Sequence, residues 1–397
     1  MINLAGRDII HSSGKFLFTG VGLGLLIGVT LTMAGVYRGM VDDGEVLLDN
    51  SGADLWVVQQ GTLGPYAEAS SVYDDIWRAV RSMPGVAQAA NVTYLTTQVG
   101  KSGLDVRAMV VGMAMGEPGD PGWPPQLVAG RHVTRGHYEA VADIATGFRL
   151  GDQFDIRRNS FTVVGLTRRM VSSSGDPMVF VPLHDAQDAQ FLRDNDAILM
   201  QRRRTAANPA FNGPGVSEAV AASQTTNNFV NAILVRLESG YTPREVASHI
   251  SRWQRLAVYD RAEMENILIG KLIATSSKQI GMFLVILAVV SAAIVAFIIY
   301  TLTMDKVREI AVLKLIGTTN RTIAGMIMQQ AVVLGLIGFV VGKITASLAA
   351  PLFPKYVLLL PGDAVLGVVA VLMICVLASL VSIRMALKVD PAVAIGG

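Results

Sequence analysis

Four stretches of the chain lack charged residues and consist mainly of apolar side chains. A bilayer core about 30 Å thick is crossed by about 20 apolar helical residues, and each stretch is long enough. The charge-free stretches are 16–37, 279–304, 322–342 and 364–383. We therefore predict four transmembrane helices, the third of which continues past Lys343 to residue 347.

The first of these stretches has an alternative interpretation as a cleaved signal peptide. Basic residues precede it, and Ala34 is a small residue that suits a cleavage site. However, its apolar run exceeds the h-region of a signal peptide, which is about 7–15 residues long. We expect an uncleaved anchor, preceded by an amphipathic segment over residues 1–15 that lies on the inner membrane surface.

The segment between the first two predicted spans, 38–278, alternates strand-like and helix-like patterns. Strands are expected at 53–59, 86–97, 106–112, 153–157, 161–165, 178–181, 231–237 and 256–260. Ser71 and Thr242 each precede an acidic residue by three positions, which is the spacing of a helix capping box. A further helix is expected from about 262 to 278, where it joins the second span as a stalk.

This pattern predicts a mixed α/β domain in two parts. Strand–helix–strand units at 53–112 and 231–260 are expected to pack together, and about 130–225 is expected to form an inserted β-rich lobe. The Gly- and Pro-rich stretch 116–125 and the Ala-, Asn- and Ser-rich stretch 205–228 are predicted to be loops.

The charge pattern predicts how the chain crosses the membrane. Short loops rich in Lys and Arg stay on the cytoplasmic side. Such residues cluster at the start (Arg7, Lys15), between spans two and three (Lys306, Arg308, Lys314, Arg321) and in the tail (Arg384, Lys388). We therefore place both termini, the loop 305–321 and the tail 384–397 in the cytoplasm. The segments 38–278 and 348–363 then lie outside, in the periplasm.

Composition excludes several classes of function. Only 16% of the residues are charged and the net charge is +2, which argues against nucleic acid as a partner. The single cysteine, Cys375, forms no disulfide within the chain. His132 and His137 have no further ligand at metal-binding spacing, so a solvated loop is preferred to a zinc site. No catalytic, cofactor-binding or nucleotide-binding motif is found, and 338–345 departs from the phosphate-loop pattern.

Some residues in or near the predicted spans have two interpretations. Glycines recur at short spacing in the first and third spans, at Gly20, Gly24, Gly28, Gly335, Gly338 and Gly342. This spacing favours close helix packing, either within one subunit or at a dimer seam. Lys343 either extends towards the lipid headgroups or contacts substrate. The run 202–204, three arginines, is either a solvated surface or a contact for headgroups or an acidic partner.

The loop after the second span has helical periodicity. Val307, Ile310, Ala311 and Lys314 fall on one face, with Glu309 and Leu313 beside it. Gly317 is expected to end this helix. It is either an ordinary interfacial loop or a short amphipathic helix that fits a groove on a partner.

The sequence of this loop resembles permeases of the MacB/FtsX type. The segment 304–342 reads MDKVREIAVLKLIGTTNRTIAGMIMQQAVVLGLIGFVVG, like the family's cytoplasmic loop and third span. The segments 150–166, 178–187 and 388–395 also resemble this family. A narrower resemblance, through ADLWVVQQGTLGPYAE at 53–68, is to DevC-like permeases, which lack a fused ATPase.

The resemblance implies the subunit of an ABC exporter that has no catalytic site or bound cofactor of its own. ATP with Mg would bind a separate ATPase, present in two copies beside a permease homodimer in the bacterial inner membrane. A periplasmic adaptor and an outer-membrane TolC-like protein would complete the complex. Residues implied to couple to the ATPase are Arg308, Glu309, Ile310, Leu313, Lys314 and Gly317. The alternatives are a signalling permease, which controls a cell-wall hydrolase or senses antibiotics, and a lipoprotein-releasing permease.

Overall fold

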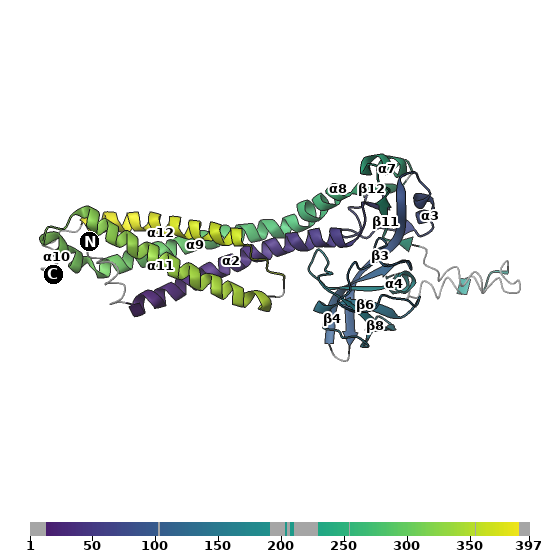
Figure 1. Ribbon diagram of the computed structural model, residues 1–397, viewed down its shortest axis with the longest axis horizontal. Coiled ribbons are helices and arrows are strands. Elements are labelled where there is room, and N and C mark those ends of the chain that lie inside the picture. The colour runs from purple at the N-terminus through teal and green to yellow at the C-terminus, as the bar shows by residue number, and fades with distance from the viewer. Residues whose placement is uncertain are drawn as a thin grey trace. The chain divides into compact units, whose positions relative to one another are not determined.

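The computed structural model describes residues 13–101, 104–190, 203–204, 207–209, 229–253, 255–353 and 355–388. They form two compact units. One comprises the residues up to Met40 together with those from Thr275 onward, and the other is Val41–Ala274 (Figure 1). We call them the helical unit and the α/β unit. The predicted amphipathic segment at the start, most of the predicted loop 205–228, and the tail motif from residue 389 lie outside the described residues.

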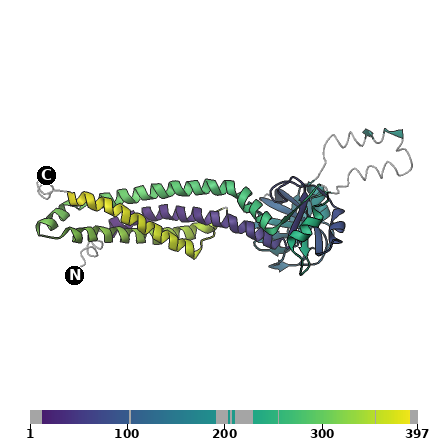
Figure 2. The ribbon, with the colours of Figure 1, turned by 90° about the horizontal axis from the view of Figure 1, so that it is seen from above.

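Four long helices dominate the helical unit and run beside one another in both views (Figures 1 and 2). They are α2 (Ser13–Asn50), α9 (Ala274–Asp305), α11 (Asn320–Ala349) and α12 (Pro361–Lys388). Among the described residues, these four are long and apolar enough to cross a membrane. The predicted four spans are therefore confirmed. Helix α2 extends well beyond the apolar run that ends at Tyr37, since no proline interrupts residues 38–50.

Glycines allow α2 and α11 to approach closely. A Cβ atom on Gly24 would lie 2.9 Å from the carbonyl oxygen of Gly338, and one on Gly342 would lie 2.8 Å from that of Gly24. Gly20 faces Ile337 of the same helix pair. These contacts favour the first of the two interpretations of the glycine pattern, which is packing within one chain.

Further along α2, two more glycines, Gly35 and Gly39, lie against the connection between α11 and α12. The amide of Leu358 donates to the carbonyl of Gly35 at 3.0 Å. The carbonyl of Tyr356 occupies the place that a side chain on Gly39 would need. Arg38, which directly precedes Gly39, forms an ion pair with Asp363 at 2.8 Å. The connection between α11 and α12 is thus held against α2.

The α/β unit is built on one large mixed sheet. The described strands are β1 (Leu55–Gln59), β3 (Val86–Lys101), β4 (Leu104–Met113), β5 (Ala129–Gly130), β6 (Glu139–Asp143), β7 (Gln153–Ile156), β8 (Asn159–Thr167), β9 (Met178–Pro182), β11 (Ala232–Leu237) and β12 (Leu256–Asp260). Their order is β12-β1-β11-β3-β4-β9-β6-β8-β5, and β7 pairs with β3 and β8. A second, small sheet pairs β2 (Val72–Tyr73) with β10 (Phe229–Val230).

The inserted segment shares this sheet and does not form a sheet of its own. Strand β9 pairs in parallel with β4, from Met109 with Met178 to Met113 with Pro182. The inserted segment has its own hydrophobic core around β7 and β8. The far end of the β3–β4 hairpin enters this core, where Val99 and Ala108 pack with the aromatic rings of β7 and β8. The long hairpin therefore runs through both parts of the domain, and the two expected parts are joined by a continuous hydrogen-bonded sheet.

Short helices cover the sheet and join it to α9. They are α3 (Ile76–Arg81), η1 (Ile144–Thr146), α4 (Leu183–Gln190), α7 (Pro243–Ile250), α8 (Arg261–Glu265) and the π-helical segment η3 (Asn266–Ile273). The Thr242 capping box is present, with the Glu245 carboxylate accepting from the Thr242 amide at 3.2 Å. The stalk is helical from Arg261 onward, as expected, but the π-helical stretch within it was not foreseen.

The capping box expected at Ser71 was wrong. Residues after Ser71 form β2, and α3 begins only at Ile76, after Asp75, whose side chain makes no capping hydrogen bond. The backbone at 72–73 forms hydrogen bonds with β10 instead. The spacing of residues around Ser71 gives no information about this distant partner. Strand β6 was also missed, because its sequence EAVAD consists mainly of Glu, Ala and Asp, which are depleted in strands.

Candidate functional site in the loop helix

The loop between α9 and α11 contains a short helix, α10 (Val307–Leu315). Gly317 follows it with φ of 92°, a conformation that favours glycine. The amide of Gly317 donates to Lys314 and that of Thr318 donates to Leu313, both at 3.0 Å. These two bonds form a Schellman motif. The helix therefore ends at the glycine that the sequence indicated.

One face of α10 is anchored to the neighbouring helices. Ile310 and Ala311 are 3% and 2% exposed. They join a hydrophobic cluster with Ile323 and Ile327 of α11 and with Ile383 and Ala386 of α12. Because packed clusters resist small displacements, α10 is expected to move together with the ends of α11 and α12.

A charged side chain reinforces this anchor. The Nζ atom of Lys314 donates to the carbonyl oxygen of Leu387, at 2.8 Å. Leu387 lies in the last turn of α12, where backbone carbonyls lack partners within the helix. Lys314 therefore ties α10 to the end of α12.

The opposite face of α10 is exposed and largely apolar. Its exposed residues are Arg308, Glu309, Val312, Leu315 and Ile316. They follow one another at the spacing of a single helical face. The three apolar side chains are 45%, 66% and 76% exposed, in that order. We call these five residues the α10 face. Contiguous exposed apolar residues on a short loop are typical of a binding surface.

The six residues implied for coupling to the ATPase therefore lie in different environments. Arg308 and Glu309 lie on the α10 face. Ile310 is buried, Lys314 is bound to α12, and Leu313 is half-buried. Val312, Leu315 and Ile316 are not among the residues that the family resemblance implies for coupling. Their spacing was visible, but the apolar residues on both sides of α10 left open which side is buried.

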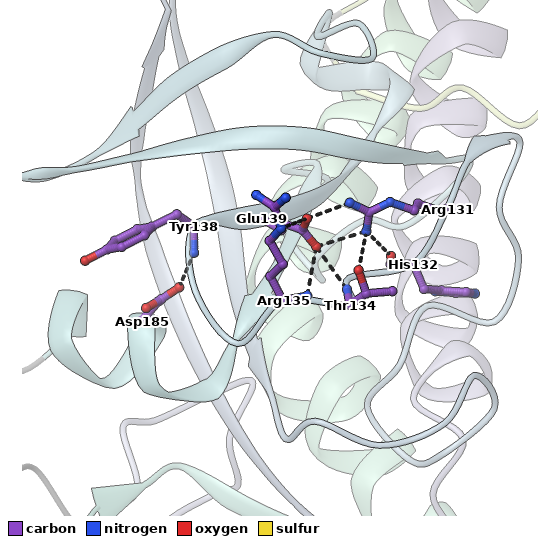
Figure 3. A network of polar contacts seen from close by, with 7 residues as sticks. All are labelled: Arg131, His132, Thr134, Arg135, Tyr138, Glu139 and Asp185. Atoms are coloured by element: carbon purple, nitrogen blue, oxygen red, sulfur yellow. Dashed lines mark hydrogen bonds and ion pairs between the residues drawn. The ribbon is translucent and has the colours of Figure 1, made fainter.

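The α/β unit contains a cluster of polar side chains, which Figure 3 shows. The Glu139 side chain, 5% exposed, accepts from Arg131 at 2.6 and 3.0 Å and from the amides of Thr134 and Arg135 at 2.9 and 3.0 Å. Its bond with Arg131, followed by the two amides, lowers its pKa to about 2. The buried Asp185 accepts from the amide of Tyr138 at 2.8 Å. These carboxylates hold the loop before β6 in place.

This cluster is a structural anchor with no metal-binding geometry. The His137 Nδ1 lies 2.7 Å from Asp185, whereas the ring of His132 packs on Trp123 with centroids 5.5 Å apart. Within the described ranges, no group of three or more His, Cys, Asp or Glu residues is arranged to hold a metal ion. Lys343 is exposed on α11, and Arg203 and Arg204 are exposed as well, while Arg202 lies outside the described residues.

Two family models match the chain. The one described as MacB-like periplasmic core domain matches residues 16–252, which is more than half of the sequence. The chain belongs to this family. A second model, FtsX-like permease C-terminal, matches residues 281–391 and so includes α10 of this MacB-like protein. The resemblance to MacB/FtsX-type permeases inferred from the loop is thereby confirmed.

The curated relatives of this chain are named as permeases. Two proteins of Mycobacterium tuberculosis (strain ATCC 25618 / H37Rv), the uncharacterized ABC transporter permeases Rv0072 and Rv2563, are 27% and 25% identical over the whole of both chains. The periplasmic region of MacB from Actinobacillus actinomycetemcomitans is 10% identical, with a TM-score of 0.34 over 54% of this chain and 94% of that one. The extracellular domain of the transporter YknZ from Gram-positive bacteria is 12% identical, with a TM-score of 0.31 over 52% and 99%.

The coarse assignment follows from the family models and the relatives. The protein is an ABC transporter permease of the MacB/FtsX type, a class of non-catalytic subunit that implies an ATPase partner. Its four spans and its permease relatives make it a multi-pass protein of the inner membrane. The DevC-like subtype remains a prediction.

Proposed function

We propose that this permease transmits mechanical work from a separate ABC ATPase to the α/β unit and so drives export. The observation that supports this is the two-sided construction of α10. Its buried face is fixed to α11 and α12, while its opposite face leaves Val312, Leu315 and Ile316 exposed. A rigid helix with an unburied apolar face suits a contact that must transmit force.

The size of this face is adequate for a specific contact. Full burial of one such side chain is worth about 1.5–3 kcal/mol, and these three are about half to three-quarters exposed. Burying them under an ATPase would contribute on the order of 3 kcal/mol, before the charged pair Arg308 and Glu309 adds specificity. Because association itself costs at least about 4 kcal/mol, one such face does not bind an ATPase tightly alone, and we propose that two permease–ATPase contacts act together in the complex.

Force applied to α10 has direct routes to the membrane helices. The amide of Ile310 donates to Lys306 at 2.9 Å, and the amide of Lys306 donates to Thr303 of α9 at 3.2 Å. Together with the cluster around Ile310, these bonds link α10 to three of the long helices. We propose that two permeases and two ATPases form the complex, and that ATP and Mg bind on the ATPases alone.

The export pathway we propose lies outside the membrane helices. The charge pattern predicts α10 in the cytoplasm and the α/β unit in the periplasm. There the α/β unit would contact an adaptor that leads to a TolC-like duct, as the DevC-like resemblance implies. The four spans have almost no internal charge, which suits levers better than the walls of a polar channel.

The decisive experiment replaces Leu315 and Ile316 with Asp together. We expect ATPase co-purification with the permease, and permease-dependent stimulation of ATP hydrolysis, to fall at least tenfold. The matched control is Thr319→Asp, which adds a charge on the same loop at an exposed N-cap position where Asp is well tolerated. Wild-type ATPase binding by the double variant would disprove the proposed contact.

A second experiment separates export from signalling, since both would use the same transmission. The intact complex is purified from membranes through a tag on the permease, and its stoichiometric partners are identified. We expect an adaptor and an outer-membrane duct protein. Recovery of a cell-wall hydrolase or a sensor kinase in their place would overturn the export assignment while leaving the ATPase contact intact.

A further inference from the structure

The helix that leads from the α/β unit into α9 changes its hydrogen-bonding pattern part-way. It begins as α8, continues as the π-helical segment η3 over Asn266–Ile273, and becomes α-helical again at Ala274. A π-helix is rare, usually occurs as a short insertion within an α-helix, and is frequent at functional sites. Eight π-helical residues are therefore an unusual feature that calls for a cause.

The start of this helix is firmly fixed. Asp260 accepts from the amide of Glu263 at 2.8 Å, and Glu263 accepts from that of Asp260 at 3.1 Å, so a capping box closes the first turn. Arg261 pairs with Asp49 of α2. Met264 and Leu268 are fully buried in a core that also contains Leu47 and Leu48. The first turns cannot rotate without breaking these contacts.

The second half of η3 is packed on one side only, where Ile273 is buried and Leu272 contacts the same core. Gly270 and Lys271 are exposed, and Ile269 is only half-buried. The α2 residue that faces this half is a glycine: a Cβ on Gly44 would lie 3.4 Å from the Cδ1 of Ile273 and 3.9 Å from the Cγ1 of Ile269. Two glycines thus accompany η3, one within it and one opposite. Both are unfavourable in helix interiors. Gly44 leaves room for Ile269 and Ile273 against α2, whereas Gly270 is exposed and lies outside this contact.

The chain passes between the α/β unit and the helical unit twice, and the two passages differ. Helix α2 is α-helical throughout Ser13–Asn50. Only the second passage contains a π-helical stretch.

We infer that η3 is a two-state register switch, which changes between π- and α-helical hydrogen bonding. A shift of one residue in an α-helix corresponds to a rotation of about 100°. The switch would therefore turn the residues after Ile273 about the helix axis, while the part around Met264 stays fixed. The α form has the better backbone hydrogen bonding, whereas the π form keeps Ile267 and Ile273 buried. Opposing preferences of this kind make an element bistable.

This inference rests on the proposed function for its purpose, because transmission through α9 would set the state of η3. Its test does not depend on that function. Spin labels are placed at Ala262 and Lys278, both exposed and on either side of η3, with Cys375 replaced by alanine. The full-length permease is measured in lipid nanodiscs, alone and with its ATPase, with and without ATP, Mg and vanadate.

We expect two label-to-label distances in the permease alone, and at least a threefold change in their ratio when the ATPase is trapped with vanadate. A single, unchanged distance in the permease alone and in every nucleotide state would overturn the switch. That result would leave the α10 contact untouched. Conversely, loss of ATPase binding with two distances still present would count against the proposed function and not against the switch.

A pair of variants adds a second, independent test. Deletion of Gly270 removes one residue, so that the rest can continue as an α-helix, whereas Gly270→Ala keeps the length. We expect the deletion to give one distance and no response to vanadate with ATP hydrolysis retained, and the substitution to behave as wild type. A deletion variant that still shows both distances would contradict the inference. If the deletion variant does not fold, the distances in the labelled chain that retains Gly270 decide whether the register switch exists.

Discussion

At the scale of single residues, Glu139 shows how one buried carboxylate organises a loop. It lies at the start of β6, with its side chain 5% exposed, and its oxygens accept four hydrogen bonds from residues 131–135. A charged side chain is tolerated there because Arg131 neutralises it and two backbone amides complete its bonding. Its pKa is lowered to about 2 as a result.

This pKa predicts an acid-sensitive contribution to stability. A carboxylate with a depressed folded-state pKa stabilises the fold above its unfolded pKa, and the contribution disappears as pH falls through the folded pKa. We expect about 2 kcal/mol of unfolding free energy to be lost between about pH 5 and the folded pKa of about 2. Denaturant unfolding of wild type and Glu139→Gln, followed against pH, measures it.

At neutral pH, the free energy of unfolding of Glu139→Gln should be lower than that of wild type by a similar amount. Below about pH 5 it should change less with pH than the wild-type value. Asp155→Asn, on β7, is a suitable control because it also removes one carboxylate from this unit. If the two variants have the same pH dependence, Glu139 is not the source of the acid sensitivity.

At the scale of the element, α10 has two faces with different tasks. Ile310 belongs to the cluster that holds the helix, whereas Leu315 is 66% exposed. Substitution of each of these two residues by alanine therefore distinguishes the anchoring of α10 from its binding to a partner. Ile310→Ala leaves a cavity in a packed cluster and should destabilise the local structure by about 2–4 kcal/mol, whereas Leu315→Ala should cost less than about 0.5 kcal/mol.

Limited trypsin digestion measures this difference directly. The loop contains Lys306, Arg308, Lys314 and Arg321 as cleavage sites. We expect Ile310→Ala to be cut in the loop at least tenfold faster than wild type, because local opening exposes the backbone. Leu315→Ala should be cut at the wild-type rate. Equal rates for all three proteins would mean that the cluster does not hold α10.

The sequence predicted α10 and its end but not the orientation of the helix. Gly317 signalled the end because a left-handed residue closes the Schellman motif, which is a local requirement. Which face is buried depends on Ile323, Ile383 and Ala386, and these come from helices that follow later in the chain. Periodicity alone could not choose between two faces that both carry apolar residues.

At the scale of the whole molecule, the chain combines a four-helix membrane unit with an α/β unit inserted after the first span. The positive-inside pattern predicts that α10 and the α/β unit lie on opposite sides of the membrane. This orientation is needed for transmission, since ATP is available only on the cytoplasmic side.

Single cysteines test the orientation. In a Cys375→Ala background, Ser160→Cys places an exposed thiol in the α/β unit and Leu315→Cys places one on α10. An impermeant maleimide added to intact spheroplasts of a strain that lacks the ATPase should label the first and spare the second. Permeabilisation should expose both, since no ATPase then covers residue 315. Labelling of Leu315→Cys in intact spheroplasts would reverse the assignment.

The sequence by itself determined the four spans, most strands of the sheet and the end of α10. Those features rest on local requirements: an apolar run must satisfy its backbone bonds as a helix in lipid, and alternation or a glycine sets a strand or a cap. The tertiary structure decided the partners of Gly24 and Gly342, the shared sheet through β4 and β9, the strand in place of a helix start at Ser71, and the π-helical η3. Each of these depends on contacts between segments far apart in the chain, whose free energies outweigh local preference.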